Sequence, residues 1–388
     1  MRDQTIAIVI NTAWNIFNFR LGLMHALKRE GYRVVAIAPR DAYSEKIEAA
    51  GFTYMPIEMN NKGTNPFEDL KLTASLYACY KKLSPDLILH YTIKPNIYGS
   101  MAARLLGIPT ISNISGLGTV FLEESLSSHI AQYLYKIALS MPQKVFFQNP
   151  HDRELFLEKR LVAQEKTALL PGSGINLKQF GEAPCKTEPH TFCFLFIGRL
   201  LGDKGLVEFA EAAKHILSLP PKERNYMEPH FCILGAPYPG NPTAISEAEV
   251  EAWEKAGTVK YLGFSDDVQT HIAAADCIVL PSYREGLSRV LLEAASMRKP
   301  IVTTDVPGCR DVVEEGVNGY LCQAKEYLSL AEAMVKILFL NEAERHAMGE
   351  HGRKRVKEEF DEQFVIDHYL EAIRTILHPD AQNISSRA

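Results

Sequence analysis

Residues 280–294 read Leu-Pro-Ser-Tyr-Arg-Glu-Gly-Leu-Ser-Arg-Val-Leu-Leu-Glu-Ala, and this stretch decides the fold of the second half of the chain. An apolar run ends at Leu280, a tight loop carries Glu285 and Gly286, and a helical pattern begins near Ser288. The unpaired N–H groups and the positive dipole end at such a helix start predict a site for a diphosphate. Gly286 lets the backbone approach a ligand because no Cβ stands in the way.

Two carboxylates flank this loop and the start of the helix. Glu285 and Glu293 are eight residues apart, so we expect both to face one pocket. A carboxylate deep in a nucleotide pocket would accept hydrogen bonds from the vicinal ribose hydroxyls. The bare spacing is common by chance, and its position between a strand and an apolar helix is what favours a functional role.

The second half alternates apolar runs with helical or loop segments, and the first half follows the same order. In both halves, runs rich in Ile, Val and Leu predict buried strands of a parallel sheet. The expected strands are 5–10, 33–38, 86–90, 108–112, 144–148, 192–197, 230–234, 258–261, 277–280 and 300–304. Helical periods in the first half occupy 19–30, 66–82, 96–106 and 124–140. Repeated β-α units predict right-handed crossovers and open, doubly wound sheets.

The fold class is therefore α/β, with two doubly wound, Rossmann-like domains that face a central cleft, where ligands of such folds bind. A chain of 388 residues suits two domains. We predict an N-terminal domain over 1–180, a C-terminal domain over 181–360, and a terminal amphipathic helix within 361–388 that packs back toward the first domain and ends in a frayed tail.

Composition narrows the class of protein. No window approaches the ~20 apolar residues of a membrane span, and the N-terminus has no signal-peptide pattern. The seven cysteines are scattered and never spaced Cys-x-x-Cys, which favours free thiols in a reducing cytoplasm over metal binding.

Charge is uneven along the chain. Residues 1–180 carry 20 Lys and Arg against 15 Asp and Glu, whereas residues 181–388 carry 22 against 32. A mildly basic first half suits an anionic partner, such as a phospholipid surface or a diphosphate-linked acceptor; ordinary charge variation is the alternative. The sequence has no clustered stripe of Lys and Arg of the kind that a nucleic-acid-binding protein carries.

Four blocks of sequence together resemble the family 4 glycosyltransferases, retaining enzymes of the two-Rossmann GT-B fold. They are the stretch 280–294, Phe196-Ile197-Gly198-Arg199-Leu200 with Lys204-Gly205, Tyr261-Leu262-Gly263-Phe264 with Asp266-Asp267-Val268, and the segment from Pro300 to Gly319. The blocks stand in the family's order and cover most of residues 170–325.

The resemblance implies roles for individual residues of the second half. Arg199 and Lys204 would neutralise the donor diphosphate, and Glu293 would hold the ribose hydroxyls. Glu285 would contact the transferred sugar and the phosphate. The other residues of the implied donor site are Gly198, Phe264, Gly286, Leu287, Ser288 and Arg289. Fixed cations suit this chemistry, because negative charge grows on the leaving diphosphate. No metal and no cofactor are implied.

The first half holds weaker signals for an acceptor. The segment Asn11 to Arg20 reads as a loop after the first strand and lacks the family's glycine pair; its Trp14, Phe17 and Phe19 would face a lipid or sugar, or be buried. His90 and Lys94 follow the third expected strand, where Lys94 would pair with an acceptor phosphate. The alternatives are a satisfied strand-end histidine and a solvated loop lysine.

The next expected strand is followed by Ser112-Asn113-Ile114-Ser115-Gly116-Leu117-Gly118. Many family members have a histidine here that contacts the donor sugar, and this chain has none. The Gly116-Leu117-Gly118 turn is similar to that of bacterial members acting on undecaprenyl-diphosphate-linked sugars, and whether it replaces the histidine stays open. Asn113 and Ser115 are candidates for hydrogen bonds to an acceptor sugar.

Asp266 and Asp267 resemble the metal-binding carboxylates of the other glycosyltransferase fold. Because they follow Gly263-Phe264-Ser265 and precede a helical pattern, we interpret them as an N-cap instead.

These observations predict a retaining enzyme that moves a hexose or N-acetylhexosamine from a nucleotide diphosphate donor, taken as UDP-linked, to a lipid-diphosphate-linked glycan in bacterial polysaccharide synthesis. We expect it in the cytoplasm, attached weakly to the anionic inner face of the membrane. One alternative is a GT-B enzyme that makes a small soluble glycoside or epimerises a nucleotide sugar; another is a sugar-nucleotide-binding partner without turnover. The sugar, base, linkage and oligomeric state stay open.

Overall fold

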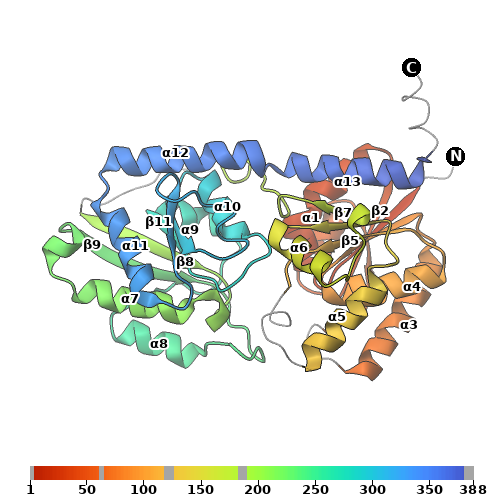
Figure 1. Cartoon of the computed structure of the whole chain (residues 1–388), viewed down its shortest axis with the longest axis horizontal. Coiled ribbons are helices and arrows are strands. Elements are labelled where there is room, and N and C mark those ends of the chain that lie inside the picture. Colours follow the sequence, from red (N-terminus) through yellow and green to blue (C-terminus); the bar gives the residue numbers. More distant parts are fainter. Residues whose placement is uncertain (1–3, 61–64, 118–125, 182–189, 380–388) are drawn as a thin grey trace, which may run out of the picture. The chain divides into compact units, whose positions relative to one another are not determined.

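The computed structural model describes residues 4–60, 65–117, 126–181 and 190–379. The chain divides into two compact units, of which the first comprises Met1–Ser173 together with Glu362–Ala388 and the second comprises Gly174–Asp361. Each unit is a parallel sheet with helices packed against it (Figure 1). The predicted class, two doubly wound Rossmann-like domains, is confirmed.

The first unit holds a seven-stranded sheet in the order β3-β2-β1-β4-β5-β6-β7, in which every described pairing is parallel. In that order the strands are Thr53–Pro56, Arg33–Ala38, Thr5–Val9, Leu87–Tyr91, Thr110–Ile114, Lys144–Phe147 and Thr167–Leu169. Its helices are α1 (Ala13–Arg29), α2 (Ser44–Ala49), α3 (Pro66–Leu83), the π-helical turn η1 (Pro95–Gly99), α4 (Ser100–Leu105), α5 (Leu126–Ala138), α6 (Pro150–Glu158), the 3₁₀ turn η3 (Gln164–Lys166) and α13 (Glu362–Leu377).

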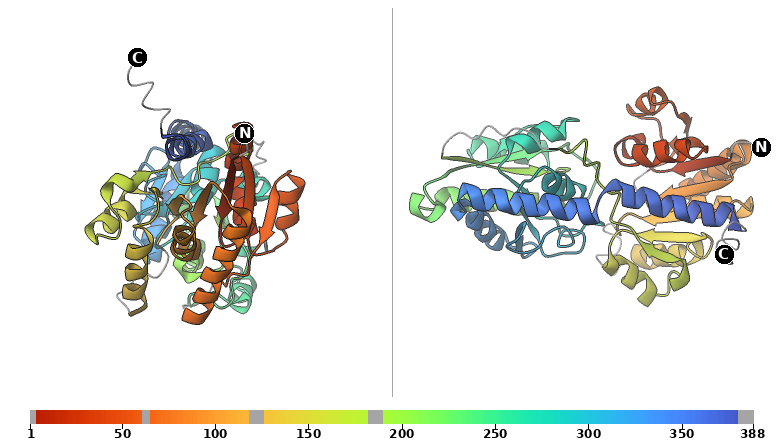
Figure 2. Two further views of the ribbon diagram at one scale, coloured as in Figure 1. Left: turned by 90° about the vertical axis from the view of Figure 1, so that its right-hand side faces the viewer. Right: turned by 90° about the horizontal axis from the view of Figure 1, so that it is seen from above.

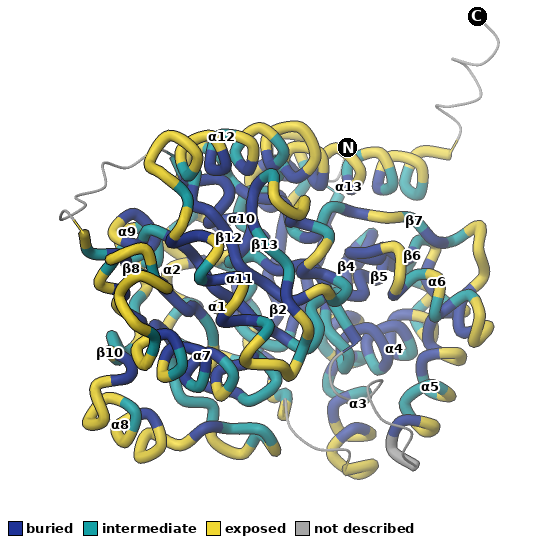
Figure 3. The backbone as a smooth tube through the Cα atoms, turned by 60° about the vertical axis from the view of Figure 1, so that its left-hand side comes forward, coloured by how far each residue is buried: buried dark blue, intermediate teal, exposed yellow. Residues whose placement is uncertain are grey.

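Apolar side chains on both faces of this sheet explain why helices cover both. Along β1, Ile6 and Ile8 join a core cluster with α1 and α13, whereas Ala7 and Val9 join a cluster with α3 and α4. Alternate residues of a strand point to opposite faces, so an unbroken apolar run needs a cover on each side. Figure 3 shows the resulting pattern of buried strands and helices with exposed outer surfaces.

The second unit holds a six-stranded parallel sheet in the order β10-β9-β8-β11-β12-β13. In that order the strands are Lys260–Tyr261, Glu228–Leu234, Thr191–Ile197, Cys277–Leu280, Ile301–Thr304 and Gly319–Cys322. Its helices are η4 (Gly202–Lys204), α7 (Leu206–Ser218), η5 (Pro221–Arg224), α8 (Glu247–Lys255), α9 (Val268–Ala274), α10 (Arg289–Ser296), α11 (Tyr327–Phe339) and α12 (Glu342–Glu359).

The boundary between the units lies at 173–174, earlier than the predicted position after residue 180. Residues past Ser173 are held by the second unit: the Ile175 N–H donates to the Phe360 carbonyl at 2.9 Å. The guanidinium of Arg353 donates to the carbonyls of Leu177 and Phe180 at 3.1 and 2.8 Å. The polar stretch 182–189, which follows the predicted boundary, lies outside the described residues.

The terminal helix α13 groups with the first unit although it follows the second along the chain. Its residues Val365, Ile366, Tyr369 and Ile373 are buried in the cluster that contains α1. Figure 2 shows this helix from above, along the first unit.

Two local expectations were wrong. Helix α1 begins at Ala13 instead of residue 19, because the Thr12 hydroxyl caps it by accepting from the Asn15 N–H at 3.2 Å. The segment of Trp14, Phe17 and Phe19 is therefore helical, not a loop. The sequence interpretation also missed β3, β7 and β13, which lie at sheet edges and are only partly buried, so that they show no continuous apolar run.

The thiol prediction agrees with the structure. The six cysteines that the structure describes are free, and Cys232, Cys277, Cys309 and Cys322 are buried.

Candidate functional site

The carboxyl ends of β8 and β11 position the site in the second unit. These neighbouring strands pair in parallel, so the segments that follow Ile197 and Leu280 emerge at the same edge of the sheet. The chain runs outward from β8 to β9 and β10 and then returns to β11 beside β8. Such a reversal of strand order is the position at which open α/β sheets bind ligands.

The two segments meet through the side chains of Lys204 and Glu285. The Lys204 ammonium forms an ion pair with the Glu285 carboxylate, and the buried Ser282 hydroxyl donates to the same oxygen, Glu285 Oε1, at 2.8 Å. The Lys204 and Glu285 side chains are 19% and 15% exposed, so the pair is shielded without being sealed from solvent. Two residues predicted separately from different blocks thus lie in direct contact.

Arg199 lies at the end of β8 with its side chain exposed. Its Cζ atom is 4.6 Å from the centre of the Tyr238 ring, a cation–π contact that holds the guanidinium over an aromatic face. Gly198, just before it, is bound to the neighbouring strand β9, because its N–H donates to the Leu234 carbonyl at 3.0 Å.

Two glycines that the sequence interpretation assigned no role bring the backbone segments together. Gly205 has φ +71°, and a Cβ there would lie 2.1 Å from the Pro281 carbonyl oxygen. Gly308 has φ +80°, and a Cβ there would lie 2.3 Å from the Glu285 carbonyl oxygen. Both positions need glycine, for conformation and for space. Their positive φ leaves no trace in the sequence beyond the glycine itself.

The loop before α10 is held by backbone hydrogen bonds to the segment after β12. The Glu285 N–H donates to the Pro307 carbonyl at 3.2 Å, and the Ser288 N–H donates to the Gly308 carbonyl at 3.0 Å. Gly286 and Leu287 between them are buried. These two hydrogen bonds therefore fix the position of the loop that leads into α10.

Ser288 is the N-cap of α10, as its hydroxyl accepts from the Leu291 N–H at 3.5 Å. Arg289, the first residue of the helix, donates through one terminal nitrogen to Oε1 of Glu293, one turn further along, at 3.3 Å and through the other to the Gly174 carbonyl. Glu293 is 7% exposed. Burial raises the pKa of its carboxyl group, and the Arg289 charge opposes that rise. Arg289 thus helps to keep Glu293 available as an acceptor of hydrogen bonds.

Phe264 lies past the end of β10 and is 60% exposed. Gly263 before it has φ +72°, and its carbonyl accepts from the Gly235 N–H at 2.8 Å. The interpretation of Asp267 as an N-cap is confirmed, because its carboxylate accepts from the Thr270 N–H at 3.1 Å and from the Thr270 hydroxyl at 2.6 Å. These hydrogen bonds lower the pKa of Asp267.

The acceptor candidates of the first unit lie deeper than predicted. His90 is fully buried, with its Nε2 atom 2.9 Å from the Tyr80 hydroxyl and its Nδ1 atom 3.4 Å from the Ser100 hydroxyl. Burial lowers its pKa to about 3. A Cβ on Gly99 would lie 2.5 Å from Nε2, which shows how closely the backbone packs on the ring. His90 is therefore the satisfied strand-end histidine of the alternative interpretation.

Lys94 is held by an ion pair. Its ammonium lies 2.8 Å from Asp69 Oδ1, and the Tyr98 hydroxyl donates to Asp69 Oδ2 at 2.7 Å. The Lys94 side chain is only 14% exposed. Its charge is matched inside the first unit, so the structure offers no support for a phosphate contact by Lys94.

Asn113 is also enclosed. Its amide nitrogen donates to the Tyr369 hydroxyl at 3.0 Å, and its amide oxygen accepts from Ser115 Oγ at 2.9 Å and from Gln148 Nε2 at 3.2 Å. Asn113 is therefore a structural residue at the carboxyl edge of the first sheet, whereas Ser115 is partly exposed. Gly118 of the predicted Gly-Leu-Gly turn lies outside the described residues.

Two of the three aromatic residues of α1 pack against each other, whereas the Phe17 ring lies 5.8 Å from that of Tyr43, just before α2. The Trp14 and Phe19 rings lie 5.0 Å apart, and Trp14 keeps 38% exposure. Other exposed apolar side chains, which the sequence interpretation missed, lie on α5 at Ile130, Tyr133 and Ile137, and on α3 at Phe67 and Leu70. The spacing of the α5 residues by three and four was a signal that could have revealed a single stripe.

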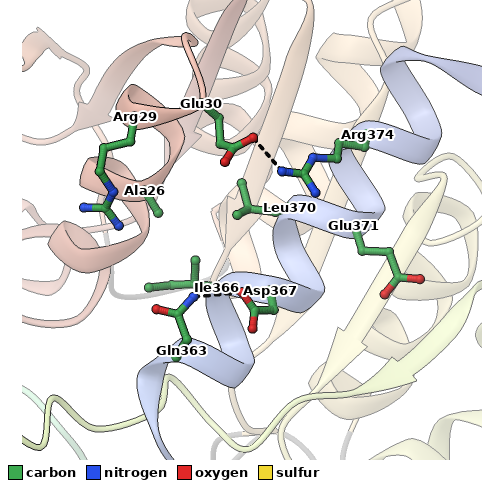
Figure 4. A pocket seen from close by; sticks show the side chains of 9 residues that line it. All are labelled: Ala26, Arg29, Glu30, Gln363, Ile366, Asp367, Leu370, Glu371 and Arg374. Atoms are coloured by element: carbon green, nitrogen blue, oxygen red, sulfur yellow. Dashed lines mark hydrogen bonds and ion pairs between the residues drawn. The ribbon is translucent and has the colours of Figure 1, made fainter. Parts of the chain in front are cut away.

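A hollow of about 470 Å³ lies between α1 and α13 (Figure 4). Its rim carries an ion pair between Arg374 and Glu30 at 2.5 Å. It adjoins the last turn of α1, and none of the predicted site residues lines it.

No three His, Cys, Asp or Glu side chains within the described ranges are placed to hold a metal ion, and metal independence stays a prediction. No helix in the described part of the chain has the length and apolar character of a membrane span.

Comparison with known proteins identifies related sequences for both units. Residues 191–339 match the family model described as glycosyl transferases group 1, and residues 5–149 match the model described as glycosyl transferase 4-like. A Campylobacter jejuni relative, an N,N'-diacetylbacillosaminyl-diphospho-undecaprenol alpha-1,3-N-acetylgalactosaminyltransferase, is 26% identical over 94% of this chain and 97% of its own length. An Escherichia coli UDP-Gal:alpha-D-GlcNAc-diphosphoundecaprenol alpha-1,3-galactosyltransferase is 26% identical over 70% of each chain.

Solved structures share the fold. A glycosyltransferase from Rickettsia africae aligns with a TM-score of 0.76 and 16% identity, over 97% of this chain and 100% of that one. The Anabaena HepE protein, solved with UDP and glucose, aligns with a TM-score of 0.74 and 18% identity, over 95% and 99% of the two chains.

Proposed function

Since this chain belongs to the group 1 and 4-like glycosyl transferases, we propose that it moves a hexose or N-acetylhexosamine from a UDP-linked donor to a lipid-diphosphate-linked sugar, with retention of configuration. The observation that carries this proposal is the meeting of Lys204, Glu285 and the start of α10 at the switch point of the second sheet. A cation beside the N-terminus of a helix, where the helix dipole is positive, suits a leaving nucleotide diphosphate.

In the proposed reaction, the bond between the sugar C1 and the diphosphate oxygen breaks, and the acceptor hydroxyl oxygen bonds to C1 on the same face. The hydroxyl proton passes to an oxygen of the leaving phosphate. Lys204 and Arg199 would offset the charge that develops there, and Glu293 would accept from the ribose hydroxyls. Glu285 would contact the transferred sugar once donor phosphate competes for Lys204. The protein then contributes position and charge, without a covalent intermediate.

The lipid-linked acceptor is supported by the relatives from Campylobacter jejuni and Escherichia coli, whose names describe diphospho-undecaprenol acceptors. The first unit adds physical support. The α5 stripe of Ile130, Tyr133 and Ile137 is exposed beside Lys136, and the first half of the chain has a positive excess. Apolar insertion and cationic attraction together suit weak docking on an anionic membrane.

A donor panel tests the proposal. Nucleotide release is measured for UDP-, GDP- and dTDP-sugars, with a prenyl-diphosphate-linked sugar, with a water-soluble glycoside, and with no acceptor. We expect UDP release that depends on the prenyl-diphosphate acceptor, together with an α-linked product from an α-linked donor.

Other outcomes of this panel separate the alternatives. Transfer to the soluble glycoside alone would favour an enzyme that makes small glycosides, and release without any acceptor would favour an epimerase or hydrolase. Nucleotide binding with no turnover would favour a binding partner. We propose that no metal or cofactor is needed, so activity should survive EDTA. Loss of activity that Mg²⁺ or Mn²⁺ restores would contradict that point.

A further inference from the structure

Arg20 is a buried cation on an apolar face of α1. Its neighbours on that face, Ile16, Leu23, Met24 and Leu27, are buried core residues, and Arg20 itself is 4% exposed. An arginine remains charged at every pH that a folded protein experiences. Its burial therefore cannot be relieved by loss of a proton, in contrast to a buried lysine or histidine.

No carboxylate matches this charge within the described part of the chain. The Nε atom is enclosed and lacks a hydrogen-bond partner there, and the guanidinium Cζ lies 4.3 Å from the centre of the Tyr91 ring. A cation–π contact offsets only part of the desolvation of a charge. Two other partly buried arginines have hydrogen-bond acceptors for their guanidinium groups: Arg353 donates to backbone carbonyls, and Arg289 donates to Glu293.

The groups around Tyr91 are polar but uncharged. Tyr369 packs 6.0 Å from Tyr91 between ring centres, and Asn113 donates to the Tyr369 hydroxyl. Burial raises the pKa of both tyrosines, with the Arg20 charge opposing the rise, so both stay neutral phenols. They do not supply the missing negative charge.

The position of the guanidinium favours a ligand. Tyr91 is the last residue of β4, a central strand, and the carboxyl edge of such a sheet is where ligands bind. Long side chains on a helix point back toward its N-terminus, and α1 begins at this same edge, four residues after β1. Ser115, partly exposed and hydrogen-bonded to Asn113, lies at the next strand end.

We propose that Arg20 is an anion-binding residue of the first unit and receives a phosphate group of the acceptor. The assignment of that phosphate to the acceptor rests on the proposed function, whereas the anion site itself does not. A guanidinium presents parallel N–H donors that match phosphate oxygens. A charge left unpaired in the free protein is then matched when the acceptor binds.

The first test uses inorganic pyrophosphate as the probe and requires no turnover. Calorimetry is carried out on the full chain with Arg199→Ala and Lys204→Ala, so that the cations of the second unit do not contribute. Adding Arg20→Met should weaken pyrophosphate binding by about tenfold or more. Adding Arg29→Met, which removes an exposed charge from the same helix, should change binding by less than about twofold.

Melting temperatures distinguish a ligand role from a structural one. Because Arg20→Met removes an unpaired buried charge, its melting temperature should equal or exceed that of the parent. Pyrophosphate binding that Arg20→Met leaves unchanged would overturn the inference. The inference would also be overturned if Arg20→Met lowered the melting temperature and Arg20→Lys bound pyrophosphate no better than Arg20→Met.

The second test concerns the acceptor, in the otherwise wild-type chain. Arg20→Met should raise KM about tenfold or more for a prenyl-diphosphate-linked sugar and leave KM unchanged for the matching alkyl glycoside, which has no phosphate. If the wild type transfers to neither acceptor while the pyrophosphate result holds, the anion site stands and the proposed acceptor is wrong. If the prenyl-diphosphate sugar is used with equal KM by both proteins, the inference about Arg20 is wrong and the proposed function stands.

Discussion

The partner of a buried or half-buried lysine distinguishes a structural residue from a candidate functional one in this protein. Lys94 is paired with Asp69 and largely buried. Lys204 is also paired, but with Glu285, a residue of the loop that leads into α10. A ligand phosphate can therefore compete for Lys204 at the place where a helix N-terminus already favours an anion.

Substitution of Lys204 or Arg199 by alanine should lower kcat by about 10²–10³ while the fold is retained, because each charge is needed most when the diphosphate leaves. The control is Lys255→Ala on α8, which removes an exposed lysine of the same unit that pairs only with exposed Glu251. Steady-state kinetics and circular dichroism check both points. Near-normal turnover of Lys204→Ala would show that the diphosphate binds elsewhere.

His90 should make stability depend on pH. Its pKa is near 6.5 in the unfolded chain and about 3 in the folded protein, where burial disfavours the charged ring. As the pH falls below about 6.5, the unfolded state takes up a proton that the folded state does not, so this residue lowers stability progressively down to about pH 3. The slope approaches about 1.4 kcal/mol per pH unit.

His90→Gln removes this titration and keeps groups that can bond Tyr80 and Ser100. Urea unfolding at several pH values between 4.5 and 7.5 should show a flatter decline for the variant than for the wild type. Parallel declines would mean that the folded protein tolerates a charged His90.

At the scale of elements, the site depends on how tightly the segments after β8, β11 and β12 approach one another. Gly205 lies against Pro281, and Gly308 lies against Glu285, in both cases at distances that no Cβ allows. These contacts place the Glu285 loop, and through it the start of α10. The donor site is thus a property of three strand ends that share one edge.

Gly308→Ala should displace the Glu285 loop and reduce kcat/KM by at least about tenfold. Gly316→Ala is the matched control, since Gly316 has a similar φ of +75° but no atom within 4 Å of the added Cβ. Both variants should lose about 1–2 kcal/mol of stability from the left-handed conformation, and only Gly308→Ala should lose activity. If Gly308→Ala and Gly316→Ala changed kcat/KM equally, Gly308 would not be needed to position the Glu285 loop.

For the whole molecule, the chain order and the units do not coincide. The first unit contains the first 173 residues and the last helix, so the chain crosses between the units twice. On the first unit, α3 and α5 cover the same side of the sheet (Figure 1), and both carry exposed apolar side chains. This surface is the one that we expect to meet the membrane.

Flotation with anionic liposomes should show binding of the full chain at low salt that fades as salt rises, because the Debye length shortens to about 8 Å at physiological ionic strength. Replacing Ile130, Tyr133 and Ile137 by glutamine should abolish flotation. Replacing Leu328 and Phe339, exposed apolar residues on α11 of the second unit, should not. Absence of wild-type binding at low salt would favour a soluble acceptor.

The sequence by itself determined the two-domain α/β class, the run of strands and helices, and the loop before α10. These features can be recognised from local sequence patterns, because buried parallel strands are apolar throughout and a capping residue marks the start of a helix. Glu285 could be named as a site residue because its loop joins a strand to a helix, whereas Lys204 was named through the resemblance to the family 4 glycosyltransferases. Short strands such as β7, and the start of α1 at Ala13, were missed because a single cap or a three-residue strand leaves too little pattern.

Only the tertiary structure decided which polar residues are enclosed. His90 meets Tyr80 and Ser100, Lys94 meets Asp69, and Asn113 meets Tyr369, which is 256 residues away along the chain. Arg20 stands over Tyr91 without a carboxylate among the described residues. Whether a strand-end side chain faces a ligand or a neighbour depends on partners brought close by packing. Such pairings between distant segments follow no local period, because burial and hydrogen bonding act through space.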